Sequence, residues 1–266
     1  MENARILLEA KNLSIGYATK KQVTTIACGI NLKLKRGNLT TLIGANGAGK
    51  STLLRTLTGI QDPLAGSVVL NGASIASYTP GHLAQQLSIV LTGSLPPSNL
   101  TVYELVALGR QPYTNWIGNL SAEDQFKINE ALKITQTEHL AHKKHFEISD
   151  GQLQKVLIAR ALAQDTDLII LDEPTTHLDF QHKANLLLLL KKLASEAGKC
   201  ILYSTHDLDI ALQLSDEAIV FIKDNVLQDT PEQLIENKVF DTLFSDDTIS
   251  FNAAKRTFTI RQDSVK

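Results

Sequence analysis

The feature that most constrains this chain is the segment at residues 44–52, which reads GANGAGKST. It matches the phosphate-binding pattern G-x-x-x-x-G-K-[S/T] at every fixed position. Small residues let consecutive backbone N–H groups curl around a phosphate, and the helix that the loop opens presents its positive N-terminal end to the anion. The flanks agree, because residues 39–43 are typical of a buried strand and residues 52–57 of a helix. The sequence therefore predicts a nucleotide site between a strand and a helix.

Each residue type in this loop has a predicted role. The Lys50 ammonium would reach the β- and γ-phosphates, and the Ser51 hydroxyl would be a ligand of Mg²⁺. The other candidate binding positions share small size or backbone donors that face the phosphates: Gly44, Asn46, Gly47, Gly49 and Thr52.

Composition favours an ordinary globular chain and argues against several other classes. The 266 residues are 43% hydrophobic and 20% charged, which is enough for a substantial core. A formal net charge of −2 gives no basis for wrapping nucleic acid, so no nucleic-acid partner is expected. The longest apolar run, at 186–190, is too short to span a bilayer. Cys28 and Cys200 are isolated in apolar stretches, which predicts small buried residues in a reducing compartment.

An antiparallel lobe is expected beside the phosphate loop. Residues 6–15 and 24–34 alternate in the manner of strands with one covered face, and residues 66–72 form another strand that ends in an Asn-Gly turn. Tyr17 follows the first of these strands. Its ring could stack on an adenine base, and the alternative is a tyrosine that simply packs at a strand end.

A helical region extends from about residue 94 to residue 164. Apolar positions recur with helical spacing after Thr101, which forms a capping box with Glu104. Trp116 lies in the loop that follows, as a loop anchor or a partner contact. Later in this region, Ser149 caps a strong helical run, and a capped helix N-terminus is also an anion site.

Two apolar strands end in polar side chains. Residues 167–174 end in Asp172 and Glu173, and residues 200–207 contain His206 after a similar run. Ligands of open α/β sheets collect at the carboxyl ends of such strands. Asp172 could hold Mg²⁺, Glu173 could polarise a water for attack on a γ-phosphate, and His206 could contact that phosphate or the water. The alternatives are a helix cap for the acidic pair and an ordinary packed or surface role for the histidine.

These motifs, in this order, resemble those of the ATP-binding cassette ATPases along nearly the whole chain. The resemblance assigns each one a family motif: the adenine-stacking loop at Tyr17, the phosphate loop, the signature at 148–152, the Walker B strand through Asp172 with catalytic Glu173, the D-loop at 177–179 and the switch histidine His206.

The resemblance implies an α/β fold, with a P-loop NTPase core, an antiparallel β-subdomain and an inserted α-helical subdomain. The whole chain would be a single cassette domain. Its expected parts are the core with the β-subdomain at 1–93 and 165–230, the helical subdomain with the signature at 94–164, and a C-terminal extension at 231–266.

The resemblance also implies partners. Two copies would sandwich two ATP molecules, with Ser149, Gly151 and Gln152 of each copy acting on the nucleotide of the other. Closure on ATP with Mg²⁺ and reopening after hydrolysis would switch a membrane permease between two states. The chain would then be cytoplasmic, held on the inner face of the cell membrane by the permease, and an extracytoplasmic substrate-binding protein would be an indirect partner.

Within this family, residues 100–124 resemble the corresponding segment of the ATPases of the iron-siderophore, haem and cobalamin importers. The expected function is therefore ATP hydrolysis that powers import of a metal chelate. The alternative is a soluble cassette ATPase of assembly or repair without a permease, and intact Glu173 and His206 disfavour a binding-only cassette. The surface at 92–118 is expected to dock a cytoplasmic permease helix, with Arg110 as an exposed polar position on it.

Two positions depart from the family pattern. Thr92 stands where a glutamine usually helps to bind Mg²⁺, and a hydroxyl can still bind the ion through water. In the signature, Ile148 and Asp150 replace the usual leucine and first glycine. The added carboxylate near a γ-phosphate requires a partner or an outward orientation.

Overall fold

The computed structural model of this protein describes residues 5–20, 22–91, 98–115, 118–176, 178–222, 225–243, 249–253 and 255–260. At its centre is a six-stranded sheet in the order β10-β9-β3-β8-β7-β6. All neighbouring strands in it are parallel except the β9–β10 edge pair. The strands are β3 (Leu39–Ile43), β6 (Leu87–Val90), β7 (Leu168–Leu171), β8 (Cys200–Ser204), β9 (Glu217–Ile222) and β10 (Asn225–Asp229).

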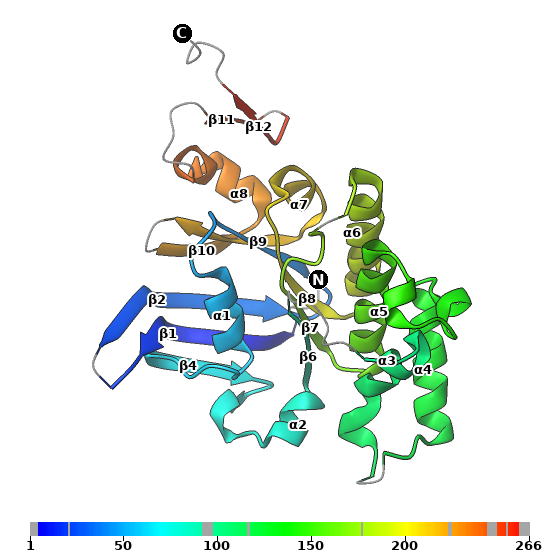
Figure 1. The fold of residues 1–266 in the computed structure, drawn as a ribbon. Coiled ribbons are helices and arrows are strands. Elements are labelled where there is room, and N and C mark those ends of the chain that lie inside the picture. The colour runs from blue at the N-terminus through cyan, green and yellow to red at the C-terminus, as the bar shows by residue number, and fades with distance from the viewer. Residues whose placement is uncertain are drawn as a thin grey trace.

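A second, antiparallel sheet has the order β2-β1-β4-β5. Its strands are β1 (Ile6–Ala18), β2 (Val23–Lys35), β4 (Ala65–Leu70) and β5 (Ala73–Ser74). The inner side chains of this sheet share one core with helix α1 (Lys50–Leu57) and one face of the central sheet. In Figure 1 the antiparallel sheet and α1 lie together on one side of the molecule.

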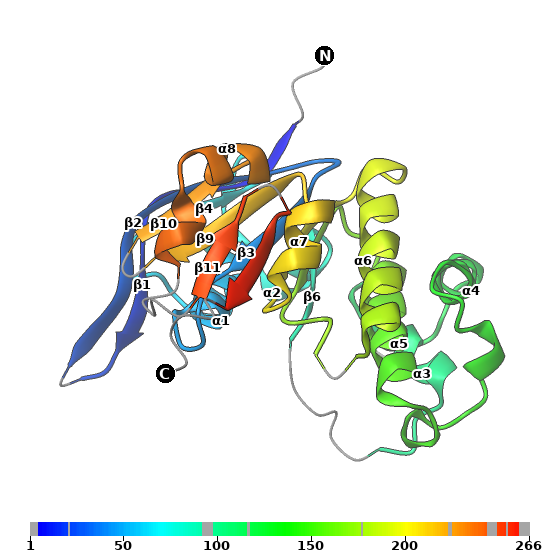
Figure 2. The same cartoon turned by 90° about the horizontal axis from the view of Figure 1, so that it is seen from above.

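The opposite face of the central sheet is covered by α5 (Asp150–Ala163) and α6 (Phe180–Ser195). Helices α3 (Val102–Ala107) and α4 (Ala122–Ile134) pack on α5 farther from the sheet. Figures 1 and 2 show this helical group at the side of the molecule away from β1 and β2. A short helix, α2 (Pro80–Ala84), precedes β6.

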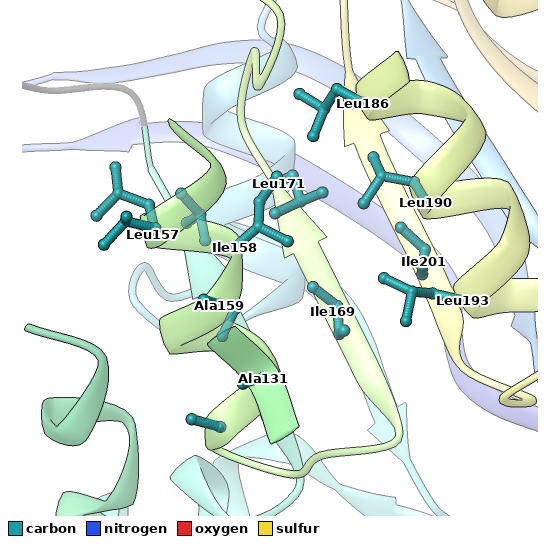
Figure 3. Packing of buried hydrophobic residues seen from close by; sticks show 14 of the residues in the cluster. Ala131, Leu157, Ile158, Ala159, Ile169, Leu171, Leu186, Leu190, Leu193 and Ile201 are labelled. Carbon is teal, nitrogen blue, oxygen red and sulfur yellow. The ribbon is translucent and has the colours of Figure 1, made fainter. Parts of the chain in front are cut away.

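Strand β7 is apolar at every position because both of its faces are buried. Leu168 and Ile170 belong to the core shared with α1, whereas Ile169 and Leu171 belong to the core shared with α5 and α6. Figure 3 shows Ile169 and Leu171 between the leucines of α6 and the side chains of α5. Side chains alternate between the faces of a strand, so two covered faces produce the uninterrupted apolar run in the sequence.

The C-terminal part forms a third, smaller core. It contains α7 (Leu208–Leu214), α8 (Pro231–Glu236), β11 (Ile249–Asn252) and β12 (Thr257–Ile260). The rings of Phe240, Phe251 and Phe258 pack there with centroid separations of 4.9–6.4 Å. No helix in the described segments is both long enough and apolar enough to cross a bilayer.

The predicted fold class is confirmed: a parallel core sheet, an antiparallel sheet and a group of helices. The capping box of Thr101 and Glu104 is also present at the start of α3. The residue boundaries proposed for the subdomains stay a prediction.

The expectation of a buried Cys28 is wrong, because this residue is exposed while Cys200 is buried. A register shift between Leu13 and Ile15 of β1 adds a residue to β2 and turns Cys28 toward solvent.

Arg110 is not the exposed position that the sequence suggested, since only 4% of it is exposed. Its Nε atom lies 2.7 Å from Asp124 Oδ1, Nη1 donates to the Ala163 carbonyl, and the guanidinium carbon lies 4.0 Å from the centroid of the Tyr113 ring. Burial alone would raise the pKa of Asp124, but hydrogen bonds from Ser121 and Arg110 outweigh it and hold that pKa below its usual value. Arg110 lies in the 3-10 helix Leu108–Tyr113 that follows α3, and it therefore links this segment to α4 and α5.

We expect Arg110→Ala to lower the free energy of unfolding by about 3–5 kcal/mol, because it leaves the Asp124 carboxylate buried without its cation. The matched control is Arg36→Ala. Arg36 also forms a 2.7 Å pair, with Asp167, but both side chains are more than 40% exposed. That control should cost no more than about 1 kcal/mol. Urea unfolding measures both, and equal losses would contradict the structural role of Arg110.

Candidate functional site

The predicted site residues meet at one edge of the central sheet. Strand β8 is paired in parallel with β3 on one side and with β7 on the other. In this register Ser204 lies beside Leu42, and Leu171 lies beside Tyr203. The chain leaves β3 into the phosphate loop, leaves β7 at Asp172 and leaves β8 toward His206. Three strand ends thus deliver the loop, the carboxylates and the histidine to the same place.

The phosphate loop closes around the side chain of Lys50. Gly49, the N-cap of α1, has φ 106° and ψ 10°, a left-handed conformation that favours glycine. Lys50 is 6% exposed, and its ammonium donates to the carbonyls of Gly44 (2.9 Å) and Ala45 (3.2 Å). Burial lowers the pKa of Lys50 below its usual range, and the nearby charges of Glu173 and Asp172 oppose this shift. The loop therefore holds a buried cation next to the acidic pair.

The other loop positions differ in exposure. Gly44 is buried, whereas Asn46, Gly47 and Ser51 face solvent. Thr52 is 5% exposed. Three of the residues that were predicted to surround phosphate and metal, Asn46, Gly47 and Ser51, are thus accessible to a ligand.

Asp172 and Glu173 are held by the neighbouring strand. The Ser204 hydroxyl donates to Asp172 Oδ1 at 2.6 Å and accepts from the Glu173 backbone N–H at 2.8 Å. Asp172 is 5% exposed, and a buried carboxylate requires such a donor. Sequence reasoning missed Ser204. The signal was a hydroxyl at the last position of an otherwise apolar strand that neighbours the acid-bearing one.

Glu173 and His206 face each other across the two strand ends. His206 Nε2 lies 2.5 Å from Glu173 Oε1, and the side chains are 44% and 23% exposed, respectively. Glu173 has φ 48°, a left-handed conformation that costs a non-glycine residue about 1–3 kcal/mol. The Ser204 contact to its N–H and the His206 contact to its carboxylate accompany this unusual backbone. A half-buried glutamate and an exposed histidine are thus held together where the two strands end.

Tyr17 lies beside the phosphate-loop helix. Its hydroxyl is 2.9 Å from Thr52 Oγ1, and 49% of the residue is exposed. The ring is therefore accessible to a ligand and anchored at its tip, and it is not a side chain packed inside the core.

The predicted signature residues start a helix on the other face of the sheet. The Ser149 hydroxyl accepts from Gln152 N–H, and Gln152 Oε1 accepts from Ser149 N–H, which completes a capping box at the start of α5. Asp150 is exposed at the first helical position, where a negative charge is favourable. A Cβ at Gly151 would lie 3.3 Å from Leu178, so a small residue allows the D-loop segment to approach. Helices α1 and α5 contribute to cores on opposite faces of the sheet.

Two predicted positions, Thr92 and His177, lie outside the described residues. Within the described part of the chain, no three His, Cys, Asp or Glu side chains are grouped so that they could hold a metal ion by themselves. Asp172 and Ser51 are the described candidates for metal contact.

Comparison with known proteins agrees with this geometry. The ABC transporter family matches residues 28–176, more than half of the chain. The iron(3+)-hydroxamate import ATP-binding protein of Bacillus subtilis is 40% identical over 84% of this chain and 81% of its own length.

Two solved structures share the fold. One is a transporter assigned to the metal-chelate type in an inward-facing conformation, with a TM-score of 0.79, 26% identity and 96% of each chain covered. The other is a dimeric ATP-binding cassette in a post-hydrolysis state with ADP and phosphate bound, with a TM-score of 0.73, 29% identity, and 85% of this chain and 99% of that chain covered. The chain therefore belongs to the ABC transporter family, in which it is an ATP-hydrolysing cassette.

Proposed function

We propose that this chain is the ATPase subunit of a membrane importer for a metal chelate of the iron-siderophore, haem or cobalamin class. The observation that carries the ATPase part is the convergence of Lys50, Asp172, Glu173 and His206 at one sheet edge. The relatives support the import part, because they are named as import subunits.

The geometry suggests a role for each side chain. Lys50 exchanges its two loop carbonyls for phosphate oxygens when ATP enters, and Tyr17 stacks on the adenine. Glu173 accepts a proton from the attacking water, and His206 holds the Glu173 carboxylate and contacts the γ-phosphate.

The residues present fit Mg²⁺. This ion retains several waters and uses one or two carboxylates together with substrate phosphates, which agrees with the buried carboxylate of Asp172 and an exposed Ser51 residue. When bound, Mg²⁺ neutralises charge on the transferred phosphoryl group. Thr92 is a further proposed contact through water.

The site is proposed to be completed by a second copy. Ser149, Gly151 and Gln152 form an exposed or half-exposed helix start, and α5 lies on the opposite face of the sheet from α1. A capped helix N-terminus attracts phosphate, so each copy would present this turn to the nucleotide of the other.

We expect Ser149→Arg to abolish ATP-driven dimerisation while monomer ATP affinity stays near the wild-type value, because bulk and misdirected charge enter the opposing face. The matched control is Ser121→Arg, since Ser121 is an exposed N-cap with the same capping box on α4. Sedimentation with ATP measures the dimer. Lys50→Ala should differ from both by weakening nucleotide binding itself. Normal dimerisation of Ser149→Arg would remove its role across the interface.

A permease helix is proposed to dock at the groove beside α2. The groove has a volume of about 420 Å³ and is lined by residues that include Gly81, Ala84, Ile89, Leu108 and Pro112. Leu108 is 44% exposed, so an apolar side chain of the groove lining faces solvent. Exposed apolar patches of this kind mark interfaces. The other part of the predicted surface, including Trp116 and residues 92–97, lies outside the described residues.

Leu108→Asp should abolish co-purification with the permease and chelate uptake, while the isolated subunit keeps its ATPase rate. The control is Phe126→Asp, which changes a 63% exposed apolar residue on α4 and should leave co-purification intact. Equal permease binding by both variants would overturn this docking site. A subunit that hydrolyses ATP but is recovered without any permease from its host would favour the alternative, a soluble ATPase of assembly or repair.

A further inference from the structure

The carboxylate of Asp207 joins three segments of the candidate site. Its Oδ2 accepts from Thr175 Oγ1 at 2.9 Å, and its Oδ1 lies 2.8 Å from Lys183 Nζ. Thr175 belongs to the turn that begins at Glu173, Lys183 belongs to α6, and Asp207 directly follows His206. One side chain therefore contacts both the turn that bears the acid and the helix that follows the D-loop.

Asp207 makes these contacts instead of capping its own helix. It occupies the N-cap position of α7, where an aspartate usually accepts a hydrogen bond from the second or third helical N–H, worth about 0.5–2 kcal/mol. Its side chain makes no such cap bond. Thr175 is 2% exposed, and the Lys183 and Asp207 side chains are 24% and 30% exposed, so the contacts are largely withdrawn from solvent. The local helix start alone does not account for this orientation.

Two contacts bracket the Glu173–His206 pair. On one side, Ser204 Oγ accepts from the Glu173 N–H. On the other side, Asp207 holds Thr175, two residues beyond Glu173. His206 lies between Ser204 and Asp207 in sequence and meets the Glu173 carboxylate at 2.5 Å. Contacts at Glu173 and at Thr175, the two ends of this stretch of the turn, thus hold the Glu173 carboxylate beside the His206 ring.

We propose that Asp207 is a positioning residue for ATP hydrolysis. It holds the Glu173 turn against His206 and, through Lys183, ties this turn to α6. Leu178 lies two residues before α6 and close to Gly151 of the predicted signature. This inference rests on the proposed roles of Glu173 and His206.

The first test compares two lysines of α6. Asp207→Asn and Lys183→Met should each lower kcat on the order of 10- to 100-fold, the range expected from small misplacement of a catalytic group, with ATP affinity near wild type. Lys191→Met is the matched control, because Lys191 forms an equivalent pair with Asp216 at 2.5 Å and similar exposure. This control should keep the wild-type kcat. Thermal unfolding confirms that each variant is folded at the assay temperature. An equal kcat loss in Lys191→Met, or none in Asp207→Asn, would overturn the proposal.

The second test is a double-mutant cycle with His206→Ala, measured on kcat. If Asp207 acts through the Glu173–His206 pair, the double variant should be little slower than His206→Ala alone. Losses that multiply would overturn the Asp207 proposal and leave the role of His206 intact. A wild-type kcat in the single variant His206→Ala would instead show that the proposed function of His206 is wrong, and the positioning role would fail with it.

Discussion

The parallel pairing of β3, β8 and β7 is the constraint on which the rest of the site depends. It places a buried lysine, a buried aspartate and a partly exposed glutamate–histidine pair at one edge of the sheet. Burying charges is costly unless they find partners. Here Lys50 uses loop carbonyls and Asp172 uses Ser204, so each group is held without a ligand while its contact remains exchangeable. A site built from strand ends is therefore ready for an anionic ligand.

The elements that hold the candidate site residues are divided between the two covered faces of the central sheet. One face carries the antiparallel sheet and α1, which position Tyr17 and the phosphate loop. The other face carries α5 and α6, and the capped turn at Ser149 and the segment at Leu178 lead into these helices. Because β7 and β8 contribute to both cores, a displacement of α6 is coupled through packing to the strands that bear Glu173 and His206. This arrangement supports the proposal that a second copy completes the nucleotide site.

The sequence predicted the fold class and the meeting of the motifs because strand ends and glycine-rich loops have strong local signals. It did not predict the hydrogen-bond partners that come together only when strands distant in the sequence pair. Ser204 and Asp207 look like an ordinary strand end and helix cap, and only the register of β7 against β8 shows what they hold. Arg110 was predicted to be exposed because charged side chains usually face solvent. In the structure it is buried and forms an ion pair with Asp124 of α4. The exposure of Cys28 likewise results from a register shift between β1 and β2, which could not be predicted from the sequence pattern.

The geometry at the strand ends supports Glu173 as the general base of ATP hydrolysis. The direct measurement is the steady-state ATP hydrolysis rate of Glu173→Gln, together with its ATP affinity and its sedimentation in the presence of ATP. We predict a rate loss of roughly 100- to 10,000-fold with affinity retained, and an ATP-bound dimer that accumulates because it does not reopen. Hydrolysis near the wild-type rate would contradict it.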